Sequence, residues 1–499
     1  MKVLIANRGE IAVRVIRACR EMGYPTVAVY SEPDRSALHV VSADQAMPIG
    51  PAPSRDSYLR IDRILEAAKK SGAEAVHPGY GFLAENAGFA RACRDAGLLF
   101  IGPSPESIDA MGSKTESRQR MQAAGVPVVP GLTEAVKSFD EIEAFARATG
   151  FPIMIKASAG GGGKGLRLVE RLEDLRSAYD RVTGEALSFF GDAAVYAEKF
   201  IVSPRHIEVQ IVGDQHGNIV HVGERECTLQ RRHQKVVEEC PSPVVDAELR
   251  EKLGAMAVRA GAAVNYYSTG TIECLMGPDR EFYFLEMNTR LQVEHPVTEM
   301  VWGLDLVKEQ LRVARGEKLS FRQEDLHPLG HAIECRVYAE DPARNFAPSP
   351  GVIRYINLPQ GPGVRNDQGV YAGYTVPVFY DPMVSKLIAH ANTRDEAIGR
   401  MRRALSEYRV EGIMTTIPFF TFIMNHPDFA AARFDTGFID RILSGVDFAE
   451  ASTSDTEIEV AIAAAAILAY EESQNVKLPE DAHSAWRDAA RAEAVRGRL

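Results

Sequence analysis

Acidic and amide side chains in two neighbouring strand-like segments could bind a divalent cation. Glu273 lies in TIECL, Glu286 and Asn288 lie in FYFLEMN, and the turn-rich GPDRE separates the two segments. Because side chains alternate along a strand, Glu286 and Asn288 share a face, and an antiparallel hairpin would bring Glu273 beside them. Mg²⁺ prefers carboxylate oxygens and nucleotide phosphates as ligands. The spacing therefore predicts a metal site at one end of a sheet.

Three polar residues follow the second segment, at Arg290, Gln292 and Glu294. They add a fixed cation, an amide and a carboxylate beside the predicted metal, a set that suits phosphorylated and anionic substrates. Taken alone, Glu273 and Glu286 are better explained as structural or solvated charges of a surface hairpin. The choice between these interpretations rests on the whole run FYFLEMNTRLQVEHPVTE.

A glycine-rich segment at Gly160–Gly163 follows the strand-like FPIMIKAS and continues into Lys164 and Gly165. Glycines let backbone N–H groups approach phosphate oxygens and suit a lid that closes over a nucleotide. The segment is not a Walker A loop, because glycine and not Ser or Thr follows the lysine. A mobile surface loop is the alternative. Lys156 and Lys114 could add phosphate contacts, although each alone could equally be solvated.

Basic residues gather in QRRHQKVVEE, at positions 230–239. This segment brings Arg231, Arg232, His233 and Lys235 together. Taken alone, it is interpreted as a basic turn that Glu238 and Glu239 neutralise.

Composition bounds the class of protein. The chain has 499 residues, 45% hydrophobic and 25% charged, which is typical of a globular protein with about three domains. A net charge of −11 argues against general nucleic-acid binding. The six cysteines have neither CxxC nor zinc spacing, so reduced thiols and a cytoplasmic location are expected.

No membrane association is expected. The apolar stretch Val3–Ala6 is too short for a signal-peptide core. The longest uncharged stretch, Gly412–Asn425, contains Pro418 and falls short of the roughly 18–20 residues of a spanning helix.

The first hundred residues alternate strand-like segments, such as KVLIA and TVAVY, with apolar residues at helical spacing. This order predicts a small parallel α/β domain. The first turn reads NRGEIA and not GxGxxG, so an NAD site is not expected. The segments HIEVQIVGD and NIVHVGERE predict a meander before the hairpin, and a third region of strands and one helix starts at His331.

The composition shifts after about Asp447. An alanine-rich helix is expected over 460–470, and a mixed-charge helix containing Trp486 over 482–498. These helices either dock a partner or fold back on the chain's own surface.

An ordered series of motifs resembles the biotin carboxylase family over roughly residues 1–445. The motifs are IANRGEIAVRVIRA, HPGYGFLAEN, MGSK, GVPVVPG, IKASAGGGGKG, PRHIEVQ, QRRHQKVVEE, GTIECL, FLEMNTRLQVEHPVTE, HAIECRVYAEDP and AGYTVP. The resemblance implies an α/β chain, α+β overall, with an ATP-grasp fold. Its implied parts are a Rossmann-like pre-ATP-grasp domain (1–113), an ATP-grasp domain with a glycine-rich lid (114–320), a biotin carboxylase C-terminal domain (331–445) and a helical tail (446–499).

The same resemblance implies the chemistry: carboxylation of biotin by ATP and bicarbonate through carboxyphosphate. It implies ATP contacts from Lys114, Lys156, Gly161, Gly162, Gly163, Glu198, Lys199, Phe200, Ile201, His206, Gln230, His233, Glu273 and Glu286. Mg²⁺ or Mn²⁺ would be held by Glu273, Glu286 and Asn288. Bicarbonate would meet Lys235, Arg290, Gln292, the Val293 backbone and Glu294, with Glu294 as general base. Arg336 would stabilise the biotin enolate.

Partners follow from the same resemblance. The sequence holds no Ala-Met-Lys-Met-like biotinylation motif and no room for a carboxyltransferase domain. We therefore expect a separate biotin carboxyl carrier protein and a separate carboxyltransferase subunit. A homodimer is also expected. The final acceptor stays open among acetyl-CoA, another acyl-CoA, pyruvate and another 2-oxo acid.

Two other functions are compatible with an ATP-grasp fold. One is another bicarbonate-activating ligase, such as half of a carbamoyl-phosphate synthetase, against which HAIECRVYAEDP and the third region argue. The other is a non-catalytic nucleotide-binding scaffold subunit, in which degenerate metal ligands would be expected.

Overall fold

The computed structural model describes most of the chain. The described residues are 1–132, 136, 138–157, 166–190, 193–448, 462–470, 489–490 and 492–493. Two units are distinguished by their internal contacts, Met1–Val446 and Asp447–Leu499.

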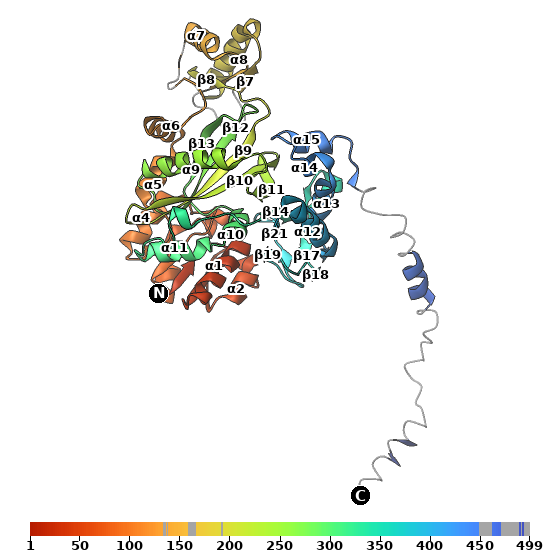
Figure 1. Cartoon of the computed structure of the whole chain (residues 1–499). Helices are drawn as coiled ribbons and strands as arrows, with labels where there is room; N and C mark the ends of the chain where they lie inside the picture. The colour runs from red at the N-terminus through yellow and green to blue at the C-terminus, as the bar shows by residue number, and fades with distance from the viewer. Residues whose placement is uncertain are drawn as a thin grey trace. The chain divides into compact units, whose positions relative to one another are not determined.

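The N-terminal region is a five-stranded parallel sheet flanked by helices, as the alternating pattern predicts (Figure 1). The strand order is β3 (Gln45–Gly50), β2 (Thr26–Ser31), β1 (Val3–Ile5), β4 (Ala75–His77) and β5 (Leu99–Phe100). Its helices are α1 (Gly9–Glu21), α2 (Leu38–Ser42), α3 (Ile61–Ser71), α4 (Ala87–Asp95), α5 (Pro105–Gly112) and α6 (Lys114–Ala123), with 3₁₀ turns η1 (Glu32–Asp34) and η2 (Ser54–Asp56). The carboxyl end of β1 leads directly into the turn Asn7–Gly9, which reaches the central cavity.

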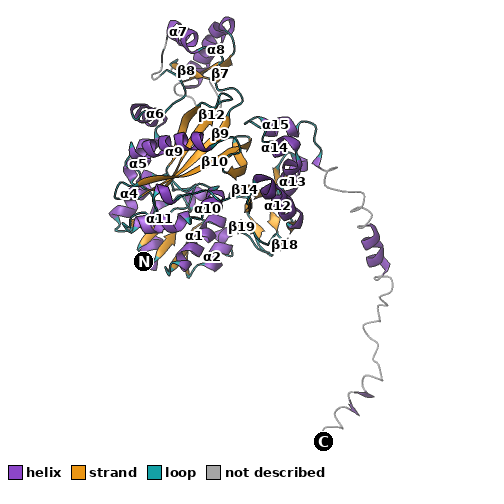
Figure 2. Ribbon diagram, viewed as in Figure 1, coloured by secondary structure: helices purple, strands orange, loops and turns teal. Residues whose placement is uncertain are grey.

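An eight-stranded antiparallel sheet forms the middle of the molecule (Figure 2). Its order is β13 (Phe282–Asn288), β12 (Ser268–Met276), β9 (Arg205–Gly213), β10 (Ile219–Arg231), β11 (Gln234–Cys240), β14 (His331–Tyr338), β21 (Met383–Ala391) and β19 (Val364–Gln368). The predicted hairpin is β12–β13, with Glu273 directly opposite Glu286. The strands after His331 continue this sheet through the pairing of β11 with β14, so the arginine at 336 lies on the same sheet as the predicted metal ligands.

A separate three-stranded sheet carries the segment around the glycine run. Its order is β7 (Leu166–Val169), β6 (Ile153–Ala157) and β8 (Val195–Lys199), and it packs against α7 (Phe139–Thr149) and α8 (Leu172–Phe190). Alternate residues of β6, such as Ile153 and Ile155, are fully buried in this small core, as period-two alternation requires.

Helices cover the eight-stranded sheet and hold the candidate site. α9 (Ala247–Ala262) packs on β9 and β10, and α10 (His295–Trp302) packs on β10, β11, β14 and β21. α11 (Leu306–Ala314) shares a core with α1 and α10, in which Val15, Val301 and Leu311 are fully buried. Each such side chain stabilises the fold by about 1.5–3 kcal/mol. This core fixes the start of α10, where the predicted base lies.

The remaining elements complete the region after residue 315. They are η3 (Gln323–Asp325), β15 (Glu340–Asp341), η4 (Pro342–Arg344), β16 (Ala347–Pro348), β17 (Gly351–Val352), β18 (Tyr355–Asn357), β20 (Thr375–Val376), α12 (Arg394–Glu407), β22 (Arg409–Glu411), α13 (Ile417–Asn425), α14 (Pro427–Ala430) and α15 (Phe438–Leu443). The apolar stretch that includes Pro418 forms α13, with Pro418 in its first turn, where proline is compatible with a helix.

Of the tail, the structure describes a helix over 462–470, where a helix is predicted, and every residue of it is exposed. Its large apolar side chains, Ile462, Ile467, Leu468 and Tyr470, are each at least 60% exposed. Most of the second predicted helix, including Trp486, lies outside the described residues. Among the described residues, no helix has the length and apolar character needed to cross a membrane.

Candidate active site

A largely buried lysine in contact with three carboxylates forms the centre of the site, and its side chain is 13% exposed. Lys235 Nζ, on β11, lies 2.5 Å from Glu208 Oε2, 2.9 Å from Glu273 Oε1 and 2.6 Å from Glu294 Oε1. Burial would lower the pKa of Lys235, but the three carboxylates outweigh it and hold this pKa well above its usual value. The ammonium group therefore stays charged. Its contacts bring together β9, β11, β12 and the start of α10.

The predicted base, Glu294, is held from both sides. Its Oε1 meets Lys235, and its Oε2 accepts a hydrogen bond from Arg336 Nη2 at 2.8 Å. Arg336 also forms an ion pair with Glu238 Oε1 at 2.6 Å. Burial would raise the pKa of Glu294, but Lys235, Arg336 and Arg225 outweigh burial and hold it well below its usual range. Glu294 is therefore ionised at neutral pH.

Arg225 contacts this centre through Glu208 and was not predicted from the sequence. Its side chain is fully buried and donates to Glu208 Oε1, to Gln210 Oε1 at 2.8 Å, and to hydroxyl oxygens of Thr271 and Thr298. Glu208 is thus bridged between Arg225 and Lys235. For this part of the site, the sequence indicates only that Glu208 shares a strand face with His206 in PRHIEVQ.

The predicted metal ligands lie together at the β12–β13 hairpin. Glu273 pairs with Glu286 across the strands, and Asn288 Nδ2 donates to Glu273 Oε1 at 2.9 Å. Burial would raise the pKa of Glu273, but Lys235 and His206 outweigh burial and hold it well below its usual range. His206 Nε2 lies 3.0 Å from Glu273 Oε2. This set of hard oxygen donors, two carboxylates and one amide, fits Mg²⁺ or Mn²⁺.

Hydrogen bonds to three side chains hold Arg290 beside these residues. Its Nη2 donates to Asn288 Oδ1 at 2.9 Å, its Nη1 to Gln292 Oε1 at 3.1 Å, and its Nε to Glu85 Oε2 at 2.9 Å. Gln292 Nε2 in turn donates to Glu273 Oε1 at 3.1 Å. Glu85 comes from the N-terminal region and was not predicted, although it lies in the motif HPGYGFLAEN. The guanidinium group is therefore oriented by contacts from two regions of the chain.

A cavity of about 490 Å³ opens beside this cluster. Three arginines, Arg8, Arg290 and Arg336, are among the residues that line it. Aromatic residues, among them Tyr80, Phe82, Tyr338 and Tyr380, line it as well. This combination of aromatic side chains and guanidinium groups suits a small, partly apolar ligand with an anionic or polar end. Tyr80 and Phe82 lie in the motif HPGYGFLAEN, but the sequence gives no direct indication that they line a cavity.

The predicted nucleotide residues fall into two groups. Lys156 forms an ion pair with Glu198 across β6 and β8, and Lys199 Nζ donates to the carbonyl oxygens of Gly150 and Phe151 at 3.2 and 3.1 Å. Phe200 and Ile201, both half-buried, follow β8.

In the second group, Gln230 and His206 lie on the eight-stranded sheet, joined by a 3.1 Å hydrogen bond between Gln230 Nε2 and His206 Nδ1. His233 is exposed in the β10–β11 turn. Gly161, Gly162, Gly163 and the side chain of Lys114 lie outside the described residues.

Comparison with known proteins decides the family. The family model "Biotin carboxylase, N-terminal domain" matches residues 1–108, "Carbamoyl-phosphate synthase L chain, ATP binding domain" matches 113–322, and "Biotin carboxylase C-terminal domain" matches 334–441. The biotin carboxylase of Halalkalibacterium halodurans is 55% identical over 438 residues, which are 88% of this chain and 97% of the relative. The chain belongs to the biotin carboxylase family.

Two further relatives of this biotin carboxylase family member extend the comparison. A pyruvate carboxylase subunit of Methanothermobacter thermautotrophicus is 54% identical over 89% of this chain and 91% of its own length. The biotin carboxylase domain dimer of the Hydrogenobacter thermophilus 2-oxoglutarate carboxylase, solved with MgADP, ADP and bicarbonate, has a TM-score of 0.80. It is 47% identical and covers 88% of this chain and 97% of that chain. The predicted ATP-grasp architecture of the biotin carboxylase family is therefore confirmed.

Proposed function

We propose that this chain carboxylates biotin at the expense of ATP and bicarbonate, as the first half-reaction of a multi-subunit carboxylase. The observation that carries the proposal is the cluster of Lys235, Glu294 and Arg336, of which Arg336 lines the cavity. It combines an ionised carboxylate with cations that suit an anionic substrate, beside a pocket large enough for a bicyclic ligand.

The first step is the attack of a bicarbonate oxygen on the γ-phosphorus of ATP. The bond from this phosphorus to the β-γ bridging oxygen breaks, which gives carboxyphosphate and ADP. Glu294 accepts the bicarbonate proton, while Arg290, Lys235 and Gln292 hold the bicarbonate with the Val293 backbone. A relative was solved with MgADP and bicarbonate, which supports bicarbonate and a magnesium nucleotide as ligands of this site.

In the second step, the C–O bond of carboxyphosphate breaks to give CO₂ and phosphate. The phosphate accepts the N1′ proton of biotin, and N1′ forms a bond to the carbon of CO₂. Arg336 stabilises the negative charge that develops on the ureido oxygen of biotin, an oxyanion role. Arg336 lines the cavity together with Tyr80 and Gly81, so we place the ureido ring there.

Glu273, Glu286 and Asn288 are the residues that we propose to hold Mg²⁺ or Mn²⁺. A divalent cation held there would offset the charge that develops on the leaving group. Nucleotide contacts come from Lys156, Glu198, Lys199, Phe200, Ile201, His206, Gln230 and His233, and from Lys114 and the glycines at 161–163.

Replacing Glu286 by Gln should raise the Mg²⁺ concentration needed for half-maximal ADP release by about ten- to a hundredfold. Glu286 is exposed, so the fold should not change. Glu281→Gln, in the turn of the same hairpin, is the matched control and should behave as wild type. Magnesium titration of steady-state turnover is the measurement, and an unchanged magnesium requirement in Glu286→Gln would remove it from the metal site.

The proposed function is tested by ADP release from the purified protein with Mg-ATP, with bicarbonate and free biotin each present or omitted. We expect strong stimulation that requires both. Turnover that needs bicarbonate but is indifferent to biotin would identify another bicarbonate-activating ligase. ATP binding without turnover, also in the presence of the partner subunits, would favour a scaffold role.

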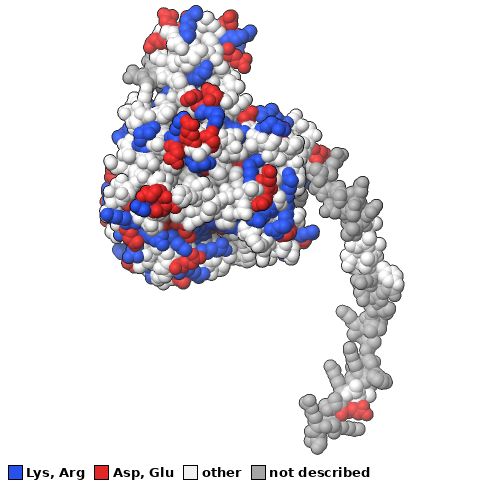
Figure 3. All heavy atoms as spheres, in the orientation of Figure 1, with Lys and Arg blue, Asp and Glu red and all other residues white. Residues whose placement is uncertain are grey.

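Partners complete the proposal. Biotin is carried on a separate carrier protein, and the carboxyl group then passes to a carboxyltransferase subunit. The chain forms a homodimer, as the domain dimer of the 2-oxoglutarate carboxylase does. The six cysteines are all buried free thiols, which supports a cytoplasmic location. On the face seen in Figure 3, acidic and basic residues are interspersed among the described residues, which supports a protein that does not bind nucleic acid.

We also propose that the tail beyond residue 446 contacts a partner subunit. Truncation after Glu450 should weaken assembly with the carrier and carboxyltransferase subunits, because it removes the exposed apolar side chains of the 462–470 helix. Carboxylation of free biotin should remain. Co-sedimentation with purified partners is the measurement, and Ile467→Ser with Leu468→Ser in the full chain is the finer variant. Unchanged assembly would contradict the idea.

A further inference from the structure

A fully buried lysine lies next to the proposed active site and has no part in the steps above. Lys386, on β21, has a side chain that is 0% exposed. Its Nζ donates a 2.8 Å hydrogen bond to the carbonyl oxygen of Val293 and lies 3.7 Å from Glu10 Oε2. A buried ammonium group is costly unless it is paired and hydrogen-bonded. Its position beside the segment that carries the base therefore indicates a specific role for Lys386.

The sheet register shows how this lysine reaches the segment. Lys386 pairs with Arg336 on β14 and with Asp367 on β19. Arg336 holds the Glu294 side chain, and Lys386 holds the carbonyl group of the preceding residue, Val293. Two cations from neighbouring strands thus form hydrogen bonds with two consecutive residues, Val293 and Glu294, at the start of α10.

The carbonyl of Val293 is not used by the first turn of α10. The N–H of His295 donates to the Gln292 carbonyl, and the N–H of Val297 donates to the Glu294 carbonyl, both at 3.3 Å. Because a peptide unit is planar, holding the Val293 carbonyl oxygen fixes the plane that joins Val293 to Glu294. The Glu294 side chain leaves the backbone directly after that plane. Its carboxylate can therefore be aimed only if the plane is fixed.

We propose that Lys386 is a positioning residue, which orients the Val293–Glu294 peptide so that the base and the adjoining backbone face bicarbonate. This inference rests on the proposed function, because it assigns Lys386 to the same first step. Lys386 acts through Val293 and touches no substrate.

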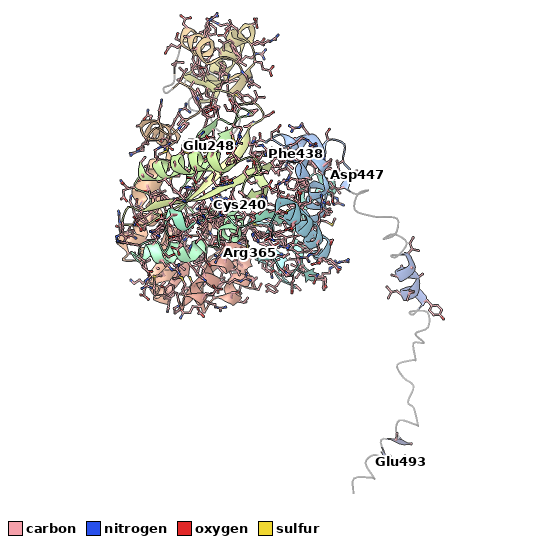
Figure 4. The ribbon with its side chains drawn as sticks, viewed as in Figure 1. Cys240, Glu248, Arg365, Phe438, Asp447 and Glu493 are labelled. Carbon is pink, nitrogen blue, oxygen red and sulfur yellow. The ribbon has the colours of Figure 1, made fainter. Side chains whose placement is uncertain are left out.

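Titratable groups from several neighbouring elements lie near the ammonium group. Glu10 comes from the first turn of α1, and Asp367 lies across the strand on β19 and is itself paired with Arg365. Arg365 is labelled in Figure 4. Glu334 lies on the same strand as Arg336, and the charge of Lys386 lowers the pKa of Glu334, although burial keeps it well above its usual value. His295, in the next position after the base, is buried, and burial together with the charge of Lys386 keeps its pKa well below its usual value.

Lys386→Met tests the inference, because methionine keeps the unbranched chain up to the position of Cε and removes the donor. We expect kcat for bicarbonate-dependent ADP release to fall by about ten- to a hundredfold, since small misplacements of a catalytic group have effects of this size. The KM for Mg-ATP should stay close to wild type. Ser385→Ala is the matched control, because Ser385 is also buried on β21 but bonds to Tyr408.

A second measurement needs no turnover. Hydrogen exchange of the amides from Leu291 to Val297 should be faster in Lys386→Met than in wild type, and exchange in α11 should not change. Lys386→Arg keeps the charge but moves the donor, so it should also lower kcat. If Lys386→Met does not fold, both measurements are made on Lys386→Arg. Wild-type kcat and wild-type exchange in either folded variant would overturn the inference.

The outcome also separates this inference from the proposed function. Wild-type protein without turnover that requires biotin and bicarbonate would refute the proposed function, while the exchange experiment would still report on Lys386. An equal loss of kcat, Mg-ATP affinity and thermal stability in Lys386→Met and Ser385→Ala would indicate a general packing role and overturn the inference.

Discussion

Replacing Glu294 by Gln is expected to lower bicarbonate-dependent ADP release by roughly 10²–10⁴-fold, because the amide cannot accept the bicarbonate proton. The side chain keeps its shape, and nucleotide affinity should stay close to wild type. Glu294 is held ionised by Lys235, Arg336 and Arg225, so the carboxylate is present throughout the neutral range of pH. Steady-state ADP release and calorimetric nucleotide binding measure the two quantities.

A matched control separates catalysis from stability. Glu299 lies on α10, is also buried, and pairs with Arg14 and Arg365 away from the cavity. Glu299→Gln therefore removes a buried carboxylate from the same helix without changing the base. It should lower thermal stability more than turnover. If Glu294→Gln turns over within a few-fold of wild type, Glu294 is not the base.

Replacing Arg336 by Met should lower carboxybiotin formation by about 10²–10³-fold, because the partner of the developing oxyanion is lost. Arg336 separates Glu294 from Glu238, so its removal also leaves two buried carboxylates without their shared cation. Breaking a buried ion pair in this way costs about 3–5 kcal/mol of the free energy of unfolding. ADP release that depends on bicarbonate alone should fall much less than carboxybiotin formation.

The two effects of Arg336→Met can be measured separately. Burial raises the pKa of Glu238 to about 7, even with Arg336 beside it, so this carboxyl group is costly to keep ionised. Adding Glu238→Gln to Arg336→Met should recover part of the lost stability and none of the carboxybiotin formation. Arg394→Met is the control. Arg394 lies on α12 and pairs with Glu239, which follows Glu238 on β11. Recovery of carboxybiotin formation in the double variant would show that Arg336 acts only through stability.

The local parts of the site were predictable because they depend on short-range periodicity. Glu273, Glu286 and Asn288 share a face through the alternation of two strands joined by one short turn. The chain order of MNTRLQVEHPVTE likewise placed Arg290 and Glu294 near them. The family resemblance added roles that spacing alone does not give.

The contacts that unite the site could not be predicted, because they join residues far apart in the sequence. Glu85 meets Arg290 across 205 positions, and Lys386 meets Val293 across 93. Periodicity tells which face a side chain occupies, but not which distant strand lies beside it. The pairing of β11 with β14, which brings Arg336 to Glu294, could not be predicted for the same reason.

The most direct test of the account is transfer of labelled carbon from bicarbonate to free biotin by the purified chain with Mg-ATP. The account predicts acid-labile carboxybiotin formed in a one-to-one ratio with biotin-stimulated ADP, and none without ATP. ADP release that biotin stimulates without label appearing on biotin, or label that appears without ATP, would contradict it.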